Sequence, residues 1–235
     1  MFFKPGRRSL AVVLVALIAL IVPAAANTAG QITIYGGNSG SKLVLHKHDG
    51  KLIVKGWQAR QKPKGCHFTK RRLRAVCDLS RAGRVEIKMG NHGDFVRVKN
   101  ALPIPLTIYL GGGSDKFIGN GENDTCFSQG AKRNRCVGGA GNDICITGEK
   151  NSDCVGGPGN DYAKHGNGSD GAWGGPGNDI CIMGRGHDGC HGGPGNDRLY
   201  GGPSSDQLYG GRGRDYCDGL PGRGKSHGCN FGPRR

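Results

Sequence analysis

The sequence predicts an all-β protein: a right-handed parallel β-roll (β-helix) of nonapeptide repeats with an N-terminal β-rich capping region. Three observations predict this class. A nine-residue period fills the second half of the chain, strand-like apolar segments fill the first half, and core-forming residues are scarce. Of the 235 residues, 46 are glycine and only 6% are aromatic. Metal ions or disulfides are therefore expected to replace much of an ordinary hydrophobic core.

The first segment, residues 1–29, has the pattern of a secretory signal peptide. Lys4, Arg7 and Arg8 precede an apolar run over residues 10–22, and alanines follow it as a cleavage site. This apolar run is too short to span a bilayer unaided. We expect a secreted, extracellular protein with no transmembrane span in its mature chain. An uncleaved membrane anchor is the alternative.

Residues 30–109 are predicted to form a basic, β-rich capping region. Apolar segments separated by Gly- and Asp-containing turns predict strands at residues 31–35, 42–46, 51–55 and 84–88. Residues 89–97 fit the nonapeptide frame imperfectly, as if the coil began before it became regular. Because the open end of a coil exposes unpaired strand edges, we expect this region to cap the first turn.

Residues 110–218 are built on a nonapeptide whose first six positions are rich in Gly and end in Asp. Full copies recur in every second unit, over residues 138–143, 156–161, 174–179, 192–197 and 210–215. Looser copies lie between them, and the frame is unbroken from Gln129 to Asp218. Two further units, over residues 110–127, are offset by one residue, Ser128. We expect two units to make one turn of a flattened coil, so that units two apart stack.

The nonapeptide predicts calcium as the cofactor, bound between stacked turns. Glycine can adopt positive φ and bring the backbone close to an ion, and calcium takes six to eight oxygen ligands from carboxylates and carbonyls. The last three positions form a short strand whose middle residue, position eight, faces the interior. The candidate ligands are the aspartates at position six and the glycines at positions two and four, namely Asp115, Asp124, Gly139, Gly141, Asp143, Gly157, Gly159, Asp161, Asp170, Gly175, Gly177, Asp179, Asp188, Gly193, Gly195, Asp197, Asp206, Gly211, Gly213 and Asp215.

The two sides of the coil are expected to bind calcium unequally. The full copies predict a near-continuous row of sites through Asp143, Asp161, Asp179, Asp197 and Asp215. The alternate units have Asn134 and Ser152 in place of Asp, and regain Asp only from residue 170 onwards. The second row should therefore be shorter.

The nonapeptide resembles the RTX, or hemolysin-type, calcium-binding repeat of secreted bacterial proteins, across roughly residues 110–218. The resemblance implies a β-roll that binds calcium between turns. In that family the repeat often accompanies a separate catalytic domain, whereas here only the short segment 30–109 lies between the leader and the repeats. The family's repeats are usually acidic, but residues 110–235 carry 14 Lys+Arg against 14 Asp+Glu.

The ten cysteines suit an oxidising compartment. In the repeats they fill position eight in consecutive units, so each pair faces across the coil like a rung. This arrangement predicts the disulfides Cys126–Cys136, Cys145–Cys154 and Cys181–Cys190. Outside the rungs, Cys66–Cys77 is expected to close a basic loop, and Cys217–Cys229 to tie down the last turn. The alternative joins stacked units, as Cys126–Cys145 and Cys136–Cys154, and leaves Cys181 without a partner. Zinc ligation is a further alternative, although no Cys-x-x-Cys occurs. Residues 219–235 form a tail tied by Cys217–Cys229.

One basic segment is a candidate polyanion-binding site. Residues 27–109 hold 16 Lys+Arg against 4 Asp+Glu, and the charge is densest between residues 55 and 74. An anionic cell-surface polymer could bind there with release of counterions. The alternative is a solvated loop that only favours solubility. The candidate residues are Lys62, Lys64, Lys70, Arg71, Arg72 and Arg74.

The sequence contains no catalytic constellation that we recognise. Its 8 histidines are scattered, and we interpret them as surface residues. We expect a non-enzymatic, monomeric structural or interaction module at the cell exterior. Two alternatives stay open: a small extracellular hydrolase or lyase, and a polyanion-binding or toxic effector that uses the basic segment.

Overall fold

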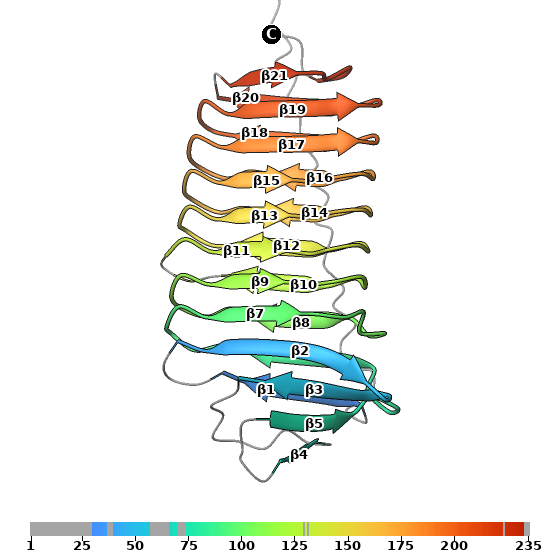
Figure 1. Ribbon diagram of the computed structural model, residues 1–235. Helices are drawn as coiled ribbons and strands as arrows, with labels where there is room; N and C mark the ends of the chain where they lie inside the picture. Colours follow the sequence, from blue (N-terminus) through green and yellow to red (C-terminus); the bar gives the residue numbers. More distant parts are fainter. Residues whose placement is uncertain are drawn as a thin grey trace, which may run out of the picture.

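The computed structural model describes residues 30–36, 40–56, 66–69, 74–128, 130, 132–222 and 224–232. In these ranges the regular structure is β throughout, and no helix there could cross a membrane. The strands stack into a tall coil that climbs from the capping region to the C-terminal end (Figure 1). The coil is right-handed, with strands that point one way in one sheet and the opposite way in the other.

The coil has two parallel walls, a nine-strand sheet and a twelve-strand sheet. In spatial order, the nine-strand sheet contains β1 (Gln31–Tyr35), β6 (Arg84–Lys88), β8 (Leu106–Tyr109), β10 (Thr125–Ser128), β12 (Ile144–Thr147), β14 (Tyr162–Lys164), β16 (Ile180–Ile182), β18 (Arg198–Gly202) and β20 (Tyr216–Pro221). The twelve-strand sheet contains β21 (Lys225–His227), β19 (Gln207–Arg212), β17 (Gly189–Pro194), β15 (Gly171–Trp173), β13 (Asp153–Val155), β11 (Arg135–Val137), β9 (Lys116–Ile118), β7 (Phe95–Val98), β2 (Lys42–His48), β3 (Lys51–Lys55), β5 (Arg74–Asp78) and β4 (Cys66–Phe68).

The strand register confirms that two nonapeptides make one turn. Cys145 pairs with Ala163, which pairs with Cys181, so each strand neighbours the strand two units away in the sequence. Position eight faces the interior: Cys154, Ala172 and most of their equivalents are almost fully buried, while Cys145 and Ala163 are partly buried. The flanking positions seven and nine point outward, as alternation in a strand requires.

The coil begins before the regular repeats. The strands expected near residues 31–35, 42–46, 51–55 and 84–88 are present as β1, β2, β3 and β6. Strand β1 pairs in parallel with β6, and β2 with β7, so both sheets continue through residue 110 without a break. Beyond β2 the chain turns back on itself, and β3, β5 and β4 extend the sheet in antiparallel pairing. This extension covers the edge of β2, as a cap should.

The two halves of the coil have different cores. The capped half contains a continuous apolar cluster that includes Ile34, Leu45, Leu52 and Ile108. In the repeats beyond Cys154 the core consists mainly of the one inward-facing residue of each strand. These residues, which include Leu199, form a separate apolar cluster. The glycine-rich composition thus limits the hydrophobic core in the repeats, but not in the cap.

Five disulfides use all ten cysteines. Their pairing is Cys66–Cys77, Cys126–Cys136, Cys145–Cys154, Cys181–Cys190 and Cys217–Cys229. All five predicted pairs are confirmed, the three within the repeats as facing rungs, and no thiol is left to ligate zinc. The Cα–Cα distances of the two central rungs, 6.0 and 6.7 Å, require the two sheets to lie closer than the roughly 10 Å of ordinary packed sheets.

Candidate calcium sites

Eleven buried aspartates form two columns along the edges of the coil. The first column lies where the chain enters the nine-strand sheet and contains Asp124, Asp143, Asp161, Asp179, Asp197 and Asp215. The second column lies where the chain enters the twelve-strand sheet and contains Asp94, Asp115, Asp170, Asp188 and Asp206. Buried Asn134 and Ser152 interrupt the second column.

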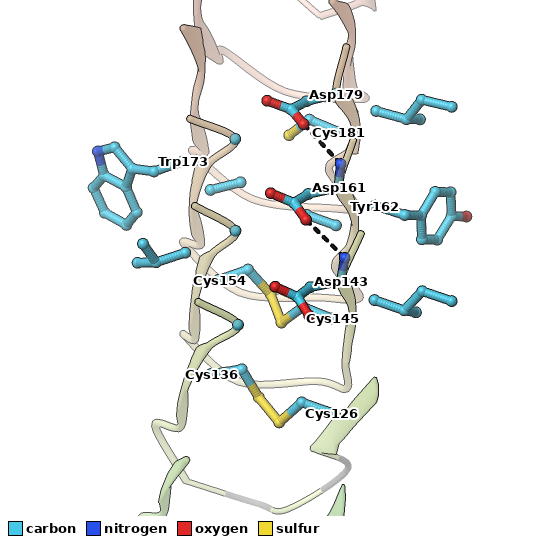
Figure 2. A pocket seen from close by; sticks show the side chains of 18 of the residues that line it. Cys126, Cys136, Asp143, Cys145, Cys154, Asp161, Tyr162, Trp173, Asp179 and Cys181 are labelled. Atoms are coloured by element: carbon cyan, nitrogen blue, oxygen red, sulfur yellow. Dashed lines mark hydrogen bonds between the residues drawn. A yellow bond between two sulfur atoms is a disulfide. The ribbon is translucent and has the colours of Figure 1, made fainter. Parts of the chain in front are cut away.

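One oxygen of each carboxylate links adjacent turns. The backbone N–H of Asp143 donates to Oδ1 of Asp161 at 2.7 Å, and that of Asp161 donates to Oδ1 of Asp179 at 2.7 Å. Figure 2 shows these three carboxylates in line on one wall, with the disulfide rungs crossing between the walls beside them. The same bond recurs along the first column from Leu106 to Asp215, so the aspartates hold the turns in register.

The other oxygen of each carboxylate is buried without a partner. All eleven Oδ2 atoms lack a hydrogen bond among the described residues. An ionised carboxylate in this position is costly unless a cation neutralises it. Burial, together with the neighbouring carboxylates of the column, accordingly raises the pKa of Asp143, Asp161 and Asp179 to about 7. Without a metal, the ionised carboxylates of both columns therefore have no positive charge to neutralise them.

The glycines of the first column leave room that no other residue would leave. A Cβ added at Gly174, position one, would overlap Oδ2 of Asp179. A Cβ at Gly175 or Gly177, positions two and four, would overlap the carbonyl oxygen of the equivalent glycine one turn below. These two glycines have φ of 116° and 149°, which other residues rarely adopt. The carbonyls of positions two and four thus point between stacked turns.

This arrangement fits calcium rather than a transition metal. Among the described residues, no cluster of three or more His, Cys, Asp or Glu side chains could hold a metal. A cation here would need backbone carbonyls as well as carboxylates, and calcium accepts that mixture. A narrow cavity of about 20 Å³ inside the coil is lined by first-column aspartates, by their position-one glycines and by inward core residues such as Cys145 and Ala163. The glycines at positions two and four do not line it, so the cavity is not itself the calcium site.

The second column is built differently. Its position-one residues include the buried side chains Thr147, His165 and Met183, where the first column has glycine. The His165 Nδ1 lies 2.9 Å from Oγ1 of Thr147 and 3.8 Å from Oδ1 of Asp170. The space beside Asp170 is therefore filled by an imidazole, and Met183 occupies the equivalent position in the next second-column unit.

Sequence reasoning missed several features of these sites. Asp94 belongs to the second column, and its N–H bonds Oδ1 of Asp115 at 2.7 Å. The interpretation of all histidines as surface residues is wrong for His165, which is only 4% exposed. A ladder of Asn side chains at position five also braces the loops: the N–H of Asn178 donates to Oδ1 of Asn160 at 2.7 Å. The repetition of Asn at position five was the available signal.

The candidate polyanion site cannot be placed in full. Lys62, Lys64, Lys70, Arg71 and Arg72 lie outside the described residues. Arg74 lies on β5, half-buried.

A comparison with family models identifies the repeats. The model for the RTX calcium-binding nonapeptide repeat matches in 4 copies, over residues 107–127, 155–189 and 191–224. The repeats of this chain are RTX repeats. No curated protein and no solved structure gives a significant match to the chain. The RTX match leaves out residues 128–154, the segment that contains Asn134 and Ser152, where the second column is interrupted.

The raised pKa values predict opposite pH dependences without and with calcium. For an RTX coil free of metal, the neutral carboxyl is the favoured form, because burial raises the pKa of Asp124 and Asp143 from 3.8 to about 7. The unfolded chain ionises near pH 4, so the stability of the metal-free protein should fall as pH rises from 4 to 7. Calcium binds the ionised form, so its stabilising effect should grow over the same range. Melting temperatures at pH 5 and pH 8, with calcium and in metal-free buffer, test this; parallel pH profiles would contradict it.

Proposed function

We propose that the protein is a secreted calcium-binding β-roll in which calcium and disulfides together hold a rigid, non-enzymatic scaffold. The observation that carries the proposal is the row of buried, unpartnered Oδ2 atoms in both columns. Each such oxygen needs a cation in the ionised state, and the RTX repeat is a known calcium-binding motif.

The first column supplies the better set of ligands. The Oδ2 atoms of its aspartates and the carbonyls of the glycines at positions two and four would hold the ions. Bound calcium would neutralise the buried carboxylates and tie each turn to the next. The chain's own part is to keep these oxygens in place, through the Oδ1 bonds between turns and the glycine backbone.

Secretion is supported by the five disulfides, which persist in oxidising compartments. The leader itself lies outside the described residues. The structural role is supported by the packing of the capping region. The inward side chains of its strands β1, β2, β3 and β6 all belong to the apolar core. We propose a monomer, because the cap covers one open end of the twelve-strand sheet.

Calcium titration of an isosteric variant tests the assignment of ligands. Asp179→Asn keeps Oδ1 as an acceptor for the N–H of Asp161 but removes the negative charge. We expect isothermal titration calorimetry to show one or two fewer calcium ions bound than in the unsubstituted protein, with the circular dichroism of the calcium-loaded protein retained. The matched control is Asp49→Asn, an exposed position with φ of 47° that Asn tolerates. Unchanged stoichiometry in Asp179→Asn, or equal loss in the control, would contradict the assignment.

A further inference from the structure

Positive charge is concentrated on one face of the molecule, the outer face of the twelve-strand sheet at its capped end. Six neighbouring strands, β5, β3, β2, β7, β9 and β11, form this part of the sheet, which lies toward the bottom of the coil in Figure 1. On these strands, or directly after them, lie the cations that we call the basic face: Lys42, Lys55, Arg74, Arg97, Lys99, Lys116 and Arg135.

The pairing register places these cations in two rows across the strands. The first row, across β5, β3, β2 and β7, is Arg74, Lys55, Val44 and Arg97. The second row, across β2, β7, β9 and β11, is Lys42, Phe95, Lys116 and Arg135. Because adjacent strands lie about 4.8 Å apart, the face extends roughly 24 Å from β5 to β11. The charges therefore form an extended array rather than an isolated cluster.

The basic face lacks compensating charge. Among the described residues of its six strands, Asp78 is the one carboxylate, and none of the seven cations forms an ion pair with a described residue. The Nε of Arg74 is buried without a hydrogen-bond partner among them, as is Nδ1 of His46 on β2. Burial lowers the pKa of His46, and the positive charges of Lys55 and Arg74 lower it further. Unpaired polar nitrogens and positive charges thus lie close together on the basic face, where no described carboxylate neutralises them.

The rest of the described surface lacks such a continuous array of uncompensated positive charges. Higher in the same sheet, the positions in register with the second row are Asp153, Gly171, Gly189 and Gln207, and a cation, Lys225, returns only on the last strand, β21. On the opposite wall, Glu86 balances Lys88, with 3.2 Å between their charged atoms. The nine-strand wall also carries cations, but they lie on β6, β14 and β18, no two of which are neighbouring strands, so they do not form a continuous array.

We propose that the basic face binds a linear acidic polysaccharide, a polymer that carries sulfate or carboxylate groups along its length. A nearly flat array of cations over about 24 Å matches repeated anionic groups better than it matches a single small anion. Single-stranded nucleic acid is disfavoured, because such sites stack bases on exposed aromatic rings. Phe95, the aromatic residue within the two rows, is half-buried beneath Lys42, whose Nζ lies 5.7 Å from the ring centroid. The polymer would lie across the strands, parallel to the coil axis.

Binding of a heparin oligosaccharide to the full mature chain in calcium buffer tests the proposal. We expect binding that weakens about tenfold or more between 50 and 200 mM salt, since each neutralised cation releases counterions. The double charge reversal Lys55→Glu/Arg97→Glu should weaken it by at least about tenfold. The matched control, Lys164→Glu/Arg198→Glu, reverses two exposed charges on the outer face of the nine-strand sheet and should change the affinity less than about twofold.

Further probes distinguish the kind of anion. A hyaluronate oligosaccharide supplies carboxylates in place of sulfates, and binding of either polysaccharide in the expected pattern supports the proposal. A single-stranded DNA oligonucleotide should bind more weakly than the better of the two. The proposal is overturned if neither polysaccharide binds, if DNA binds more tightly than both, or if the control reversal weakens binding as much as the reversal on the basic face. Circular dichroism of each variant establishes that the coil is intact.

Discussion

Removal of calcium alone should loosen the repeats without unfolding them, whereas removal of calcium together with reduction of the disulfides should abolish the coil beyond the cap. Each calcium site contributes about 2.7 kcal/mol at a hundredfold excess over its dissociation constant. Each disulfide in the repeats closes a short loop, with sequence separations of 9 to 12 residues, and contributes roughly 2–3 kcal/mol. The Asn ladder adds turn-to-turn bonds that do not depend on the metal.

Hydrogen exchange read by mass spectrometry separates the two halves of the coil in this experiment. With chelator, exchange should rise in residues 110–218 but stay slow in β1, β2 and β6, which the apolar cluster of the cap holds in place. With chelator and reductant, the repeats should exchange at the rate of an unfolded chain. Reductant in the presence of calcium is the control and should leave the calcium-bound loops protected. Complete unfolding by chelator with the disulfides intact would contradict the account.

Gly177→Ala should destabilise the calcium-loaded protein by about 3 kcal/mol or more. Gly177 has φ of 149°, and its new Cβ would overlap the carbonyl oxygen of Gly159 in the turn below. The loop must then move, and that carbonyl is one of the oxygens that we assign to calcium. For a chain of this length the change corresponds to a fall in melting temperature of roughly 6–12 °C, accompanied by weaker calcium binding.

Gly189→Ala provides the matched control for this substitution. Gly189 lies on β17 in the adjacent unit, and a Cβ there would meet no atom within 4 Å. Its effect on stability should stay within about 0.5 kcal/mol. If the two variants melt at the same temperature, the close stacking of glycine on carbonyl does not constrain the loops.

The repeats could be predicted from the sequence in detail because their constraints are local and periodic. A fixed spacing of two nonapeptides determines which strands pair, and a shared interior position determines which cysteines face each other. The contrast between Gly174 in the first column and His165 or Met183 in the second was visible in the sequence. Its meaning was not, because only the structure shows that position one adjoins the carboxylate.

The capping region resisted prediction because its contacts are distant and not periodic. Its strands could be located from apolar alternation, but nothing in the sequence indicates that β1 pairs with β6, since β2, β3, β4 and β5 lie between them in the chain. No pattern in the sequence predicts the antiparallel pairing of β3, β5 and β4 either. The basic face depends on this topology, since it brings Arg74 and Arg97 onto one surface. Sequence reasoning placed the charge in a loop and missed the array on the sheet.

The central claim is that calcium binds between stacked turns along the first aspartate column. The most direct measurement is an anomalous-difference map from crystals grown in calcium and measured at long wavelength. The account predicts a row of peaks beside the Oδ2 atoms from Asp124 to Asp215, and a second, broken row with no peak at Asn134 or Ser152. Absence of peaks along the first column, or equal and continuous rows on both sides of the coil, would contradict it.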